Sequence, residues 1–279
     1  MKLSNLRIET GNGKAKLVAD VDSPFYQYKT LFYEVPEEYK SWLSDDVYDA
    51  FIIALIYPCM KHKDDIIVDG AISERLYRNL KNYAMKCIKD FSIELSMIDI
   101  SASKLKVPEK RYHYVGAGFS GGVDSFSSIY DRFEKETDPK YKISALLCFN
   151  AGSHGDYDDS NTENKFYTRY KYLSSYPKEV GLPYIPENTN VHAYMDEGHQ
   201  QSGITRHISC VLALQAAFDR YYYASSLSYF EEKYFGRDQF EFDLSEFCEP
   251  HFLAWISTES IELVSEGGGN ISEARKRKI

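Results

Sequence analysis

Residues 113–125 read His113-Tyr114-Val115-Gly116-Ala117-Gly118-Phe119-Ser120-Gly121-Gly122-Val123-Asp124-Ser125. The apolar first half predicts a buried strand over residues 113–119, and the residues after the glycines predict a helix over residues 123–133. The loop between them is short and rich in glycine and serine. α/β folds bind phosphate at such a junction, because the unpaired N–H groups and the dipole at the start of a helix favour an anion.

The side chains of this loop suit a nucleotide with a metal ion. Gly121 and Gly122 let the backbone approach phosphate oxygens at positive φ angles, and Ser120 and Ser125 add hydroxyl groups. Asp124 would repel phosphate unless Mg²⁺ lay between them. We therefore predict a phosphate-binding site with Mg²⁺ bound to Asp124. The alternative is structural: the glycines make a tight turn, and Asp124 or Ser125 caps the helix.

Two other nucleotide-binding loops do not fit the sequence. The chain has no Gly-x-x-x-x-Gly-Lys-[Ser/Thr] motif, which excludes a Walker-type NTPase. Gly116 and Gly118 match the start of the dinucleotide fingerprint Gly-x-Gly-x-x-Gly, but the serine-rich continuation departs from it.

The pattern around the loop indicates an α/β domain over residues 107–279. An apolar run at residues 143–149 is typical of a strand covered on both faces. Further strands are expected over residues 183–186 and 221–225, and helices over residues 164–176 and 208–218. Strands that alternate with helices predict a parallel sheet.

Residues 1–106 predict a small β-rich N-terminal cap domain. Asn12-Gly13 lies between strand-like residues 6–9 and 16–21, which is typical of a hairpin because both turn positions need positive φ. The other elements expected are a third strand over residues 28–35, a helix over residues 47–55 capped by residues 44–46, and an amphipathic helix over residues 73–87. We expect this unit to pack at the carboxyl edge of the sheet and shape an acceptor pocket, or to be a stabilising appendage.

The sequence Ser-Gly-Gly-Val-Asp-Ser at residues 120–125 resembles the signature of the PP-loop ATP pyrophosphatases, and the resemblance extends over residues 112–279. The chain is most similar to the 7-cyano-7-deazaguanine synthase-like branch. This resemblance implies a sheet of the adenine-nucleotide α-hydrolase type. It implies that the loop, including Val123, binds Mg·ATP, and that the enzyme adenylates a carbonyl oxygen of its substrate. It also implies that Phe149 and Asn150 border the adenine. The chain lacks the zinc-binding cysteine cluster of that branch, which leaves the acceptor open.

Other residues are weaker candidates for the site. Arg206 can pair two phosphate oxygens and act in catalysis, although ordinary helix capping explains the same residue. Ser225 follows a strand at the edge where ligands bind. The acidic residues at 156–159 are typical of a solvated loop, with a second Mg²⁺ site as the alternative. Cys148 is expected in the core and not as a nucleophile.

The composition of the chain argues against some classes of protein. The 279 residues carry a net charge of −9, which argues against a nucleic-acid partner despite the basic residues at 275–278. The five cysteines form no Cys-x-x-Cys pair, as in proteins of a reducing compartment, and no apolar run is long enough to span a bilayer. We expect a cytoplasmic protein without a membrane segment, with a small-molecule acceptor as its partner and a homodimer as one alternative.

Three functions follow from these features. The first is a synthetase that adenylates a carbonyl or carboxylate, releases pyrophosphate and then admits a nitrogen nucleophile. The second is a sulfur-inserting enzyme of the same fold, which the absence of Cys-x-x-Cys disfavours. The third is a non-catalytic module that keeps ATP bound.

Overall fold

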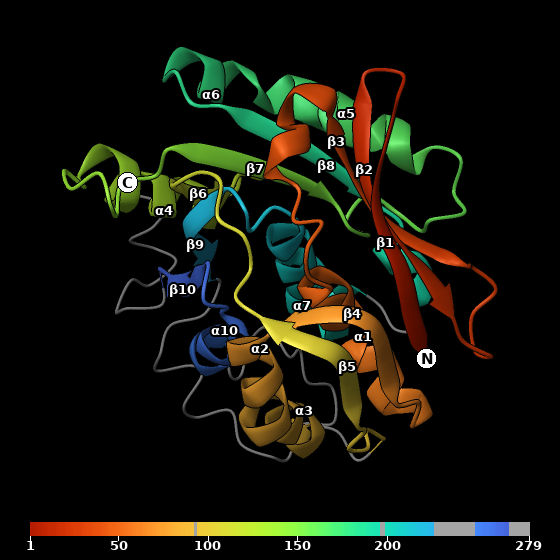
Figure 1. The fold of residues 1–279 in the computed structure, drawn as a ribbon. Coiled ribbons are helices and arrows are strands. Elements are labelled where there is room, and N and C mark those ends of the chain that lie inside the picture. The colour runs from red at the N-terminus through yellow and green to blue at the C-terminus, as the bar shows by residue number, and fades with distance from the viewer. Residues whose placement is uncertain (92–93, 196–198, 226–248, 268–279) are drawn as a thin grey trace.

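The computed structural model describes residues 1–91, 94–195, 199–225 and 249–267, which form one sheet of ten strands in the order β10-β9-β6-β7-β8-β3-β2-β1-β4-β5 (Figure 1). At one end β5, β4 and β1 run parallel, and at the other end β8, β7, β6, β9 and β10 do. Antiparallel pairs through β2 and β3 connect the two ends. The strands are β1 Lys2–Gly11, β2 Lys14–Asp22, β3 Thr30–Pro36, β4 Ile66–Ser73, β5 Ile100–Lys106, β6 Tyr114–Gly118, β7 Ala145–Asn150, β8 Tyr184–Thr189, β9 Phe218–Ala224 and β10 Glu262–Glu266.

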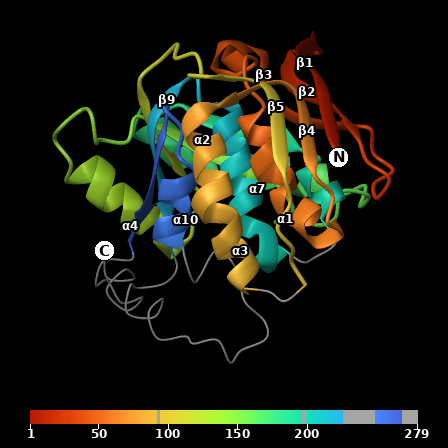
Figure 2. The ribbon, with the colours of Figure 1, turned by 60° about the horizontal axis from the view of Figure 1, so that its bottom comes forward.

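Helices cover both faces of the sheet (Figures 1 and 2). One face carries α1 Asp49–His62, α2 Glu74–Asn79, α3 Met85–Phe91, α7 His199–Ala213 and α10 Glu249–Ile256, and the other carries α4 Val123–Ile129, α5 Thr162–Leu173 and α6 Ser175–Glu179. Short 3₁₀ helices lie at Glu37–Trp42 and Val191–Tyr194, and π-helical turns at Leu80–Ala84 and Tyr130–Glu134. The chain therefore has an α/β fold with a mostly parallel sheet, as the alternation of strands and helices predicts.

The predicted N-terminal hairpin is confirmed. Asn12 and Gly13 have φ angles of 54° and 72°, and Gly11 pairs with Lys14 across the turn. Two consecutive residues with positive φ make the turn whose twist matches that of the flanking strands. The third strand is also confirmed, as β3.

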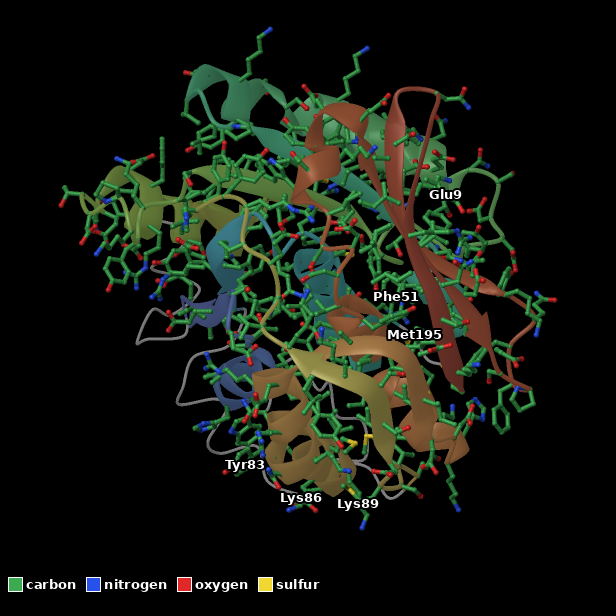
Figure 3. All side chains as sticks on the ribbon, viewed as in Figure 1. Glu9, Phe51, Tyr83, Lys86, Lys89 and Met195 are labelled. Atoms are coloured by element: carbon green, nitrogen blue, oxygen red, sulfur yellow. The ribbon has the colours of Figure 1, made fainter. Side chains whose placement is uncertain are left out.

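The predicted amphipathic helix is confirmed as a continuous helical segment through α2, the π-helical turn and α3. Leu76, Leu80 and Met85 are buried against the sheet. Figure 3 shows Lys86 and Lys89 pointing outward from the far side of the same segment. The apolar stripe therefore faces the core, as the 3.6-residue period requires.

Two predicted helix boundaries are wrong. Residues 44–46 do not cap α1, which starts at Asp49; the Ser44 N–H group instead donates to the carbonyl of Ala213 over 2.8 Å. The helix predicted over residues 208–218 spans His199–Ala213, and Phe218 begins β9. The inner face of α7 contains buried polar side chains such as Ser202 and Thr205. The sequence therefore lacks the hydrophobic pattern from which the start of this helix could be predicted.

Residues 1–106 contribute five strands to the common sheet. β3 pairs with β8 through Tyr33↔Thr189 and Glu34↔Asn188, and α1 packs against α7. Because β3 is antiparallel to β8, the segment before β3 lies at the carboxyl edge of the parallel strands, where the Tyr28 hydroxyl donates to Asp158 over 2.7 Å. The segment before β3 thus reaches this edge, whereas the role of residues 1–106 in shaping an acceptor pocket and the domain boundary at residue 106 stay predictions. No helix in the described part of the chain has the length and apolar character needed to cross a bilayer.

Candidate functional site

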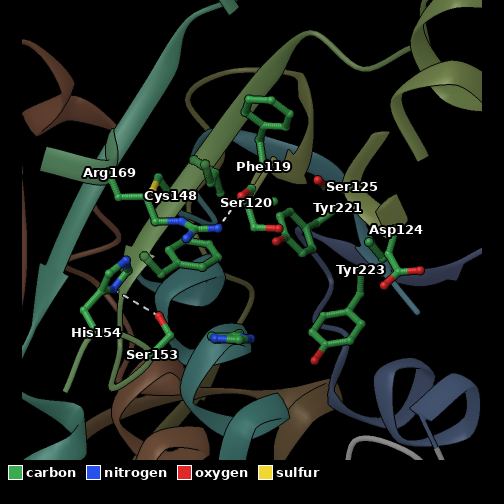
Figure 4. A pocket seen from close by; sticks show the side chains of 15 residues that line it. Phe119, Ser120, Asp124, Ser125, Cys148, Ser153, His154, Arg169, Tyr221 and Tyr223 are labelled. Atoms are coloured by element: carbon green, nitrogen blue, oxygen red, sulfur yellow. Dashed lines mark hydrogen bonds between the residues drawn. The ribbon is translucent and has the colours of Figure 1, made fainter. Parts of the chain in front are cut away.

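A cavity of about 410 Å³ lies at the carboxyl ends of β6, β7 and β9 (Figure 4). β7 and β8 extend the sheet on one side of β6, and β9 and β10 extend it on the other. Open α/β sheets bind ligands at such a switch in strand order, and the volume is within the range of small-molecule sites. The lining residues are Gly118, Phe119, Ser120, Asp124, Ser125, Leu147, Cys148, Phe149, Ser153, His154, Arg169, His207, Tyr221, Tyr223 and Ala224.

The loop after β6 depends on glycine at one position in particular. Gly121 has a φ angle of +72°, and a Cβ atom there would lie 2.5 Å from Cδ2 of Leu173 on α5. The next residue, Gly122, is the N-cap of α4 and donates its N–H to the Ser120 hydroxyl over 3.3 Å. Both the backbone conformation and the close approach of α5 therefore select glycine at position 121.

Two side chains fix the peptide planes of this loop. The Tyr184 hydroxyl on β8 donates to the carbonyl of Phe119 over 2.8 Å, and Nη2 of Arg169 on α5 donates to the carbonyl of Ser120 over 2.8 Å. In a trans peptide the C=O and the following N–H point in opposite directions, so fixing the two carbonyls also fixes the next two N–H groups. The loop is preorganised before any ligand binds.

Asp124 and Ser125 both line the cavity, but they differ in their contacts. Ser125 is buried, and its hydroxyl donates to the carbonyl of Gly122 over 2.8 Å, which is a local bond to the N-cap residue. Asp124 is the one carboxylate among the described residues that line the cavity. Figure 4 shows Asp124 on the opposite side of the cavity from Arg169. The site thus has a negative wall and a positive wall.

Aromatic rings form another part of the wall. The rings of Phe149 and His207 stack with centroids 6.0 Å apart and planes 28° from parallel, and Tyr223 lies 6.4 Å from His207. Such rings pack favourably against a flat heterocycle. Phe149 thus belongs to the aromatic part of the cavity wall, and its contact with an adenine stays a prediction.

Cys148 is partly as expected. It is a buried residue of β7, yet it also lines the cavity beside Arg169. Burial raises the pKa of the Cys148 thiol to about 11, so the thiol stays neutral near pH 7.

Several predicted site residues do not line the cavity. Asn150 is buried at the end of β7 and donates from Nδ2 to Asn188 over 2.8 Å. Arg206 is also buried: its Nε donates to the Ser202 hydroxyl over 2.8 Å, and its guanidinium packs against Gly152. The loop residues that do not line it are Gly121, Gly122 and Val123. Ser120, Asp124, Ser125 and Phe149 are thus the predicted residues that share the cavity.

The structure adds residues that the sequence does not single out. Arg169 and His154 line one side of the cavity, and Tyr221 and Tyr223 line the other (Figure 4). Arg169 lies in a polar helix whose sequence is typical of a solvent-exposed helix. Only the packing of α5 on the loop distinguishes Arg169 from an ordinary surface arginine. The two tyrosines belong to β9, and the position of Tyr223 next to the carboxyl end of that strand is the signal that points to it.

Within the described residues, the acidic loop contains no group of three or more His, Cys, Asp or Glu that could hold a metal ion, and a second Mg²⁺ site there stays an untested alternative. Asp158 accepts the hydrogen bond from Tyr28, and Asp159 pairs with Lys165 over 3.0 Å. Ser225 is buried, and its N–H donates to the carbonyl of Glu266. The basic residues at 275–278 lie outside the described residues.

Comparison of the chain with protein-family models, with curated proteins and with solved structures finds no match. A function for the chain is therefore inferred from the geometry of the cavity and from the resemblance carried by its loop.

Proposed function

We propose that the chain binds Mg·ATP in this cavity and cleaves it between the α and β phosphates, on a sheet of the PP-loop, adenine-nucleotide α-hydrolase type. One observation carries the proposal: the loop that resembles the PP-loop signature opens onto a ligand-sized cavity at the switch point of a parallel sheet, with Asp124 in its wall. A glycine-rich turn with a purely structural role does not require such a cavity.

Different parts of the cavity wall suit the phosphates and the base of a nucleotide. The hydroxyl of Ser120 and the backbone of Ser120 and Ser125 suit phosphate, and the rings of Phe149, His207 and Tyr223 suit the base.

Asp124 suits a magnesium ion that arrives with its nucleotide. No cluster of three or more His, Cys, Asp or Glu suited to a metal ion occurs within the described ranges. Mg²⁺ is usually held by one or two carboxylates together with phosphate oxygens and water, so one carboxylate is sufficient. When bound, the ion stabilises the charge that develops on the leaving pyrophosphate.

The proposed reaction is acyl activation of a small-molecule acceptor. A carbonyl or carboxylate oxygen of the acceptor attacks the α-phosphorus, the bond from that phosphorus to the bridging oxygen breaks, and pyrophosphate leaves. A nitrogen nucleophile then attacks the activated carbon and displaces AMP. In this scheme Ser120 and Ser125 orient the phosphates, and buried Arg206 supports the loop after β7 through Gly152 without touching the reacting atoms.

Sulfur insertion is the second candidate, because Cys148 lines the cavity. It is less well supported, since a neutral thiol is a poor nucleophile and burial raises the pKa of Cys148. A module that holds ATP without turnover is the third.

Analysis of the nucleotide products tests the proposal. Purified protein with Mg·ATP and a panel of acceptors is expected to form AMP and pyrophosphate, and an acceptor that is adenylated is expected to support ATP–pyrophosphate exchange. ADP as the main product would contradict the proposal, whereas bound ATP without any product would favour the non-catalytic module.

A further inference from the structure

Arg169 occupies a special place on the cavity wall. Among the described residues that line the cavity, it alone carries a permanent positive charge. It projects from α5 toward the loop that follows β6, as Figure 4 shows. Neither the loop motif nor its resemblance includes this residue.

The guanidinium group is only partly used by the protein. One N–H of Nη2 donates to the carbonyl of Ser120 over 2.8 Å. Throughout the described ranges, Arg169 makes no ion pair with a carboxylate and no second hydrogen bond. A guanidinium has five N–H donors in a rigid fork, so donors remain available to the cavity.

α5 fixes the position of this group relative to the loop. Leu173, one helical turn after Arg169, packs so closely on Gly121 that its Cδ2 would lie 2.5 Å from a Cβ atom there and would have to shift. Arg169 and Leu173 therefore contact consecutive residues of the loop from one helix face. This double contact holds Arg169 on the cavity wall beside Ser120, with its remaining N–H donors available to the cavity.

We propose that Arg169 is a further ligand-binding residue, which pairs with the pyrophosphate portion of the bound nucleotide while its contact with Ser120 holds the loop in place. The inference rests on the proposed ATP site. The anion is assigned as pyrophosphate because the arginine is anchored to the first residue of the phosphate loop and not to the aromatic wall. Arginine suits this role, since its fork pairs two phosphate oxygens at once.

Calorimetry tests this inference. The binding of inorganic pyrophosphate with Mg²⁺ and the binding of adenosine are measured for the parent protein and for Arg169→Gln. The Kd for pyrophosphate is expected to rise roughly tenfold to a hundredfold in the variant, the effect of losing a charge-assisted hydrogen bond, while that for adenosine stays unchanged. Arg169→Lys keeps the charge but lacks the forked guanidinium, so its Kd for pyrophosphate is expected to lie between those of the parent and Arg169→Gln. Lys171→Gln is the matched control, because Lys171 is an exposed cation on the same helix that does not line the cavity.

The outcomes separate this inference from the proposed function. A parent protein that binds neither ATP nor pyrophosphate would overturn the nucleotide site itself. A parent protein that binds both, with parent-like pyrophosphate affinity in Arg169→Gln, would overturn only the role of Arg169. An equal loss of affinity for adenosine and for pyrophosphate in Arg169→Gln would also overturn this role, because such a result would show that Arg169 merely supports the fold.

Discussion

Two groups of polar side chains lie beside the sheet, and they differ in how their hydrogen bonds are completed. The first surrounds Asp49, which is fully buried and accepts hydrogen bonds from the Ser73 N–H over 2.9 Å and from Gln215 Nε2 over 3.0 Å. Gln215 in turn accepts from the Thr258 hydroxyl over 2.7 Å. The second group surrounds Ser120, where Arg169 and Asp124 face an open cavity.

The difference separates a structural network from a binding site. In the Asp49 network, each carboxylate oxygen of Asp49 accepts a hydrogen bond from within the protein, and these bonds tie α1, β4 and the segment after α7 together. The loop site is open, because Arg169 retains N–H donors on the wall of a cavity large enough for a ligand. Polar groups that the fold itself satisfies contribute to stability, and those left facing a cavity point to a ligand.

The comparison predicts that Asp124→Asn has the largest effect on turnover. Loss of the carboxylate removes the metal-assisted stabilisation of the leaving pyrophosphate, so kcat is expected to fall about a hundredfold or more, with ATP binding still measurable. Steady-state kinetics at saturating Mg²⁺ measures this. Asp131→Asn is the control, since Asp131 lies in the same helical segment, pairs with Lys135 and does not line the cavity. Turnover near that of the parent would reduce Asp124 to a structural residue.

A second prediction separates backbone strain from damage to the loop. Gly121→Ala places a side chain at φ +72° and 2.5 Å from Leu173, so the Kd for ATP is expected to rise roughly tenfold. Gly181→Ala is matched to it, because Gly181 has a φ of +74° and no atom lies within 4 Å of the place that the new methyl group would take. Both variants are expected to lose about 1 kcal/mol of stability from strain. Equal ATP affinity in the two would show that the loop tolerates the contact.

Local chemistry allowed part of this molecule to be predicted from its sequence. Asn12-Gly13 determines its turn without long-range help, and the loop at residues 120–125 carries its own glycines and carboxylate. β4 and β5 were not predicted, because Asp69-Gly70 interrupts the alternation in β4 and most of β5 is exposed.

The parts of the site that were missed depend on packing between distant segments. Arg169 contacts Ser120 only because α5 returns over the loop, and the pattern of an exposed helix contains no sign of that contact. Arg206 has the residue type that a phosphate site needs, but packing places its guanidinium against Gly152. Residue type can therefore nominate a site residue, and only tertiary packing decides which one reaches the ligand.

The Asp49 network predicts a smaller effect, on stability and its pH dependence. Burial raises the pKa of Asp49 from 3.8 to about 6, so the folded state holds the proton more tightly than the unfolded state does. This contribution to the free energy of unfolding is fully present below pH 3.8 and is lost as the pH rises through about 6. Between pH 7 and pH 5 the parent is expected to gain about 1 kcal/mol that Asp49→Asn does not. Urea unfolding of both proteins at the two pH values measures the difference, and parallel pH profiles would contradict it.

The smallest expected effect belongs to Cys148→Ala, which tests whether the open site uses its thiol. Cys148 lines the cavity, but burial raises the pKa of its thiol to about 11, so little thiolate exists near pH 7. If the reaction is adenylation followed by attack of nitrogen, the kcat of the variant is expected to stay within about threefold of the parent, because only one buried sulfur is lost. Cys59→Ala is the control for a buried thiol remote from the cavity. A kcat reduced a hundredfold in Cys148→Ala alone would instead favour the sulfur-inserting enzyme, since that chemistry needs a sulfur nucleophile at the cavity wall.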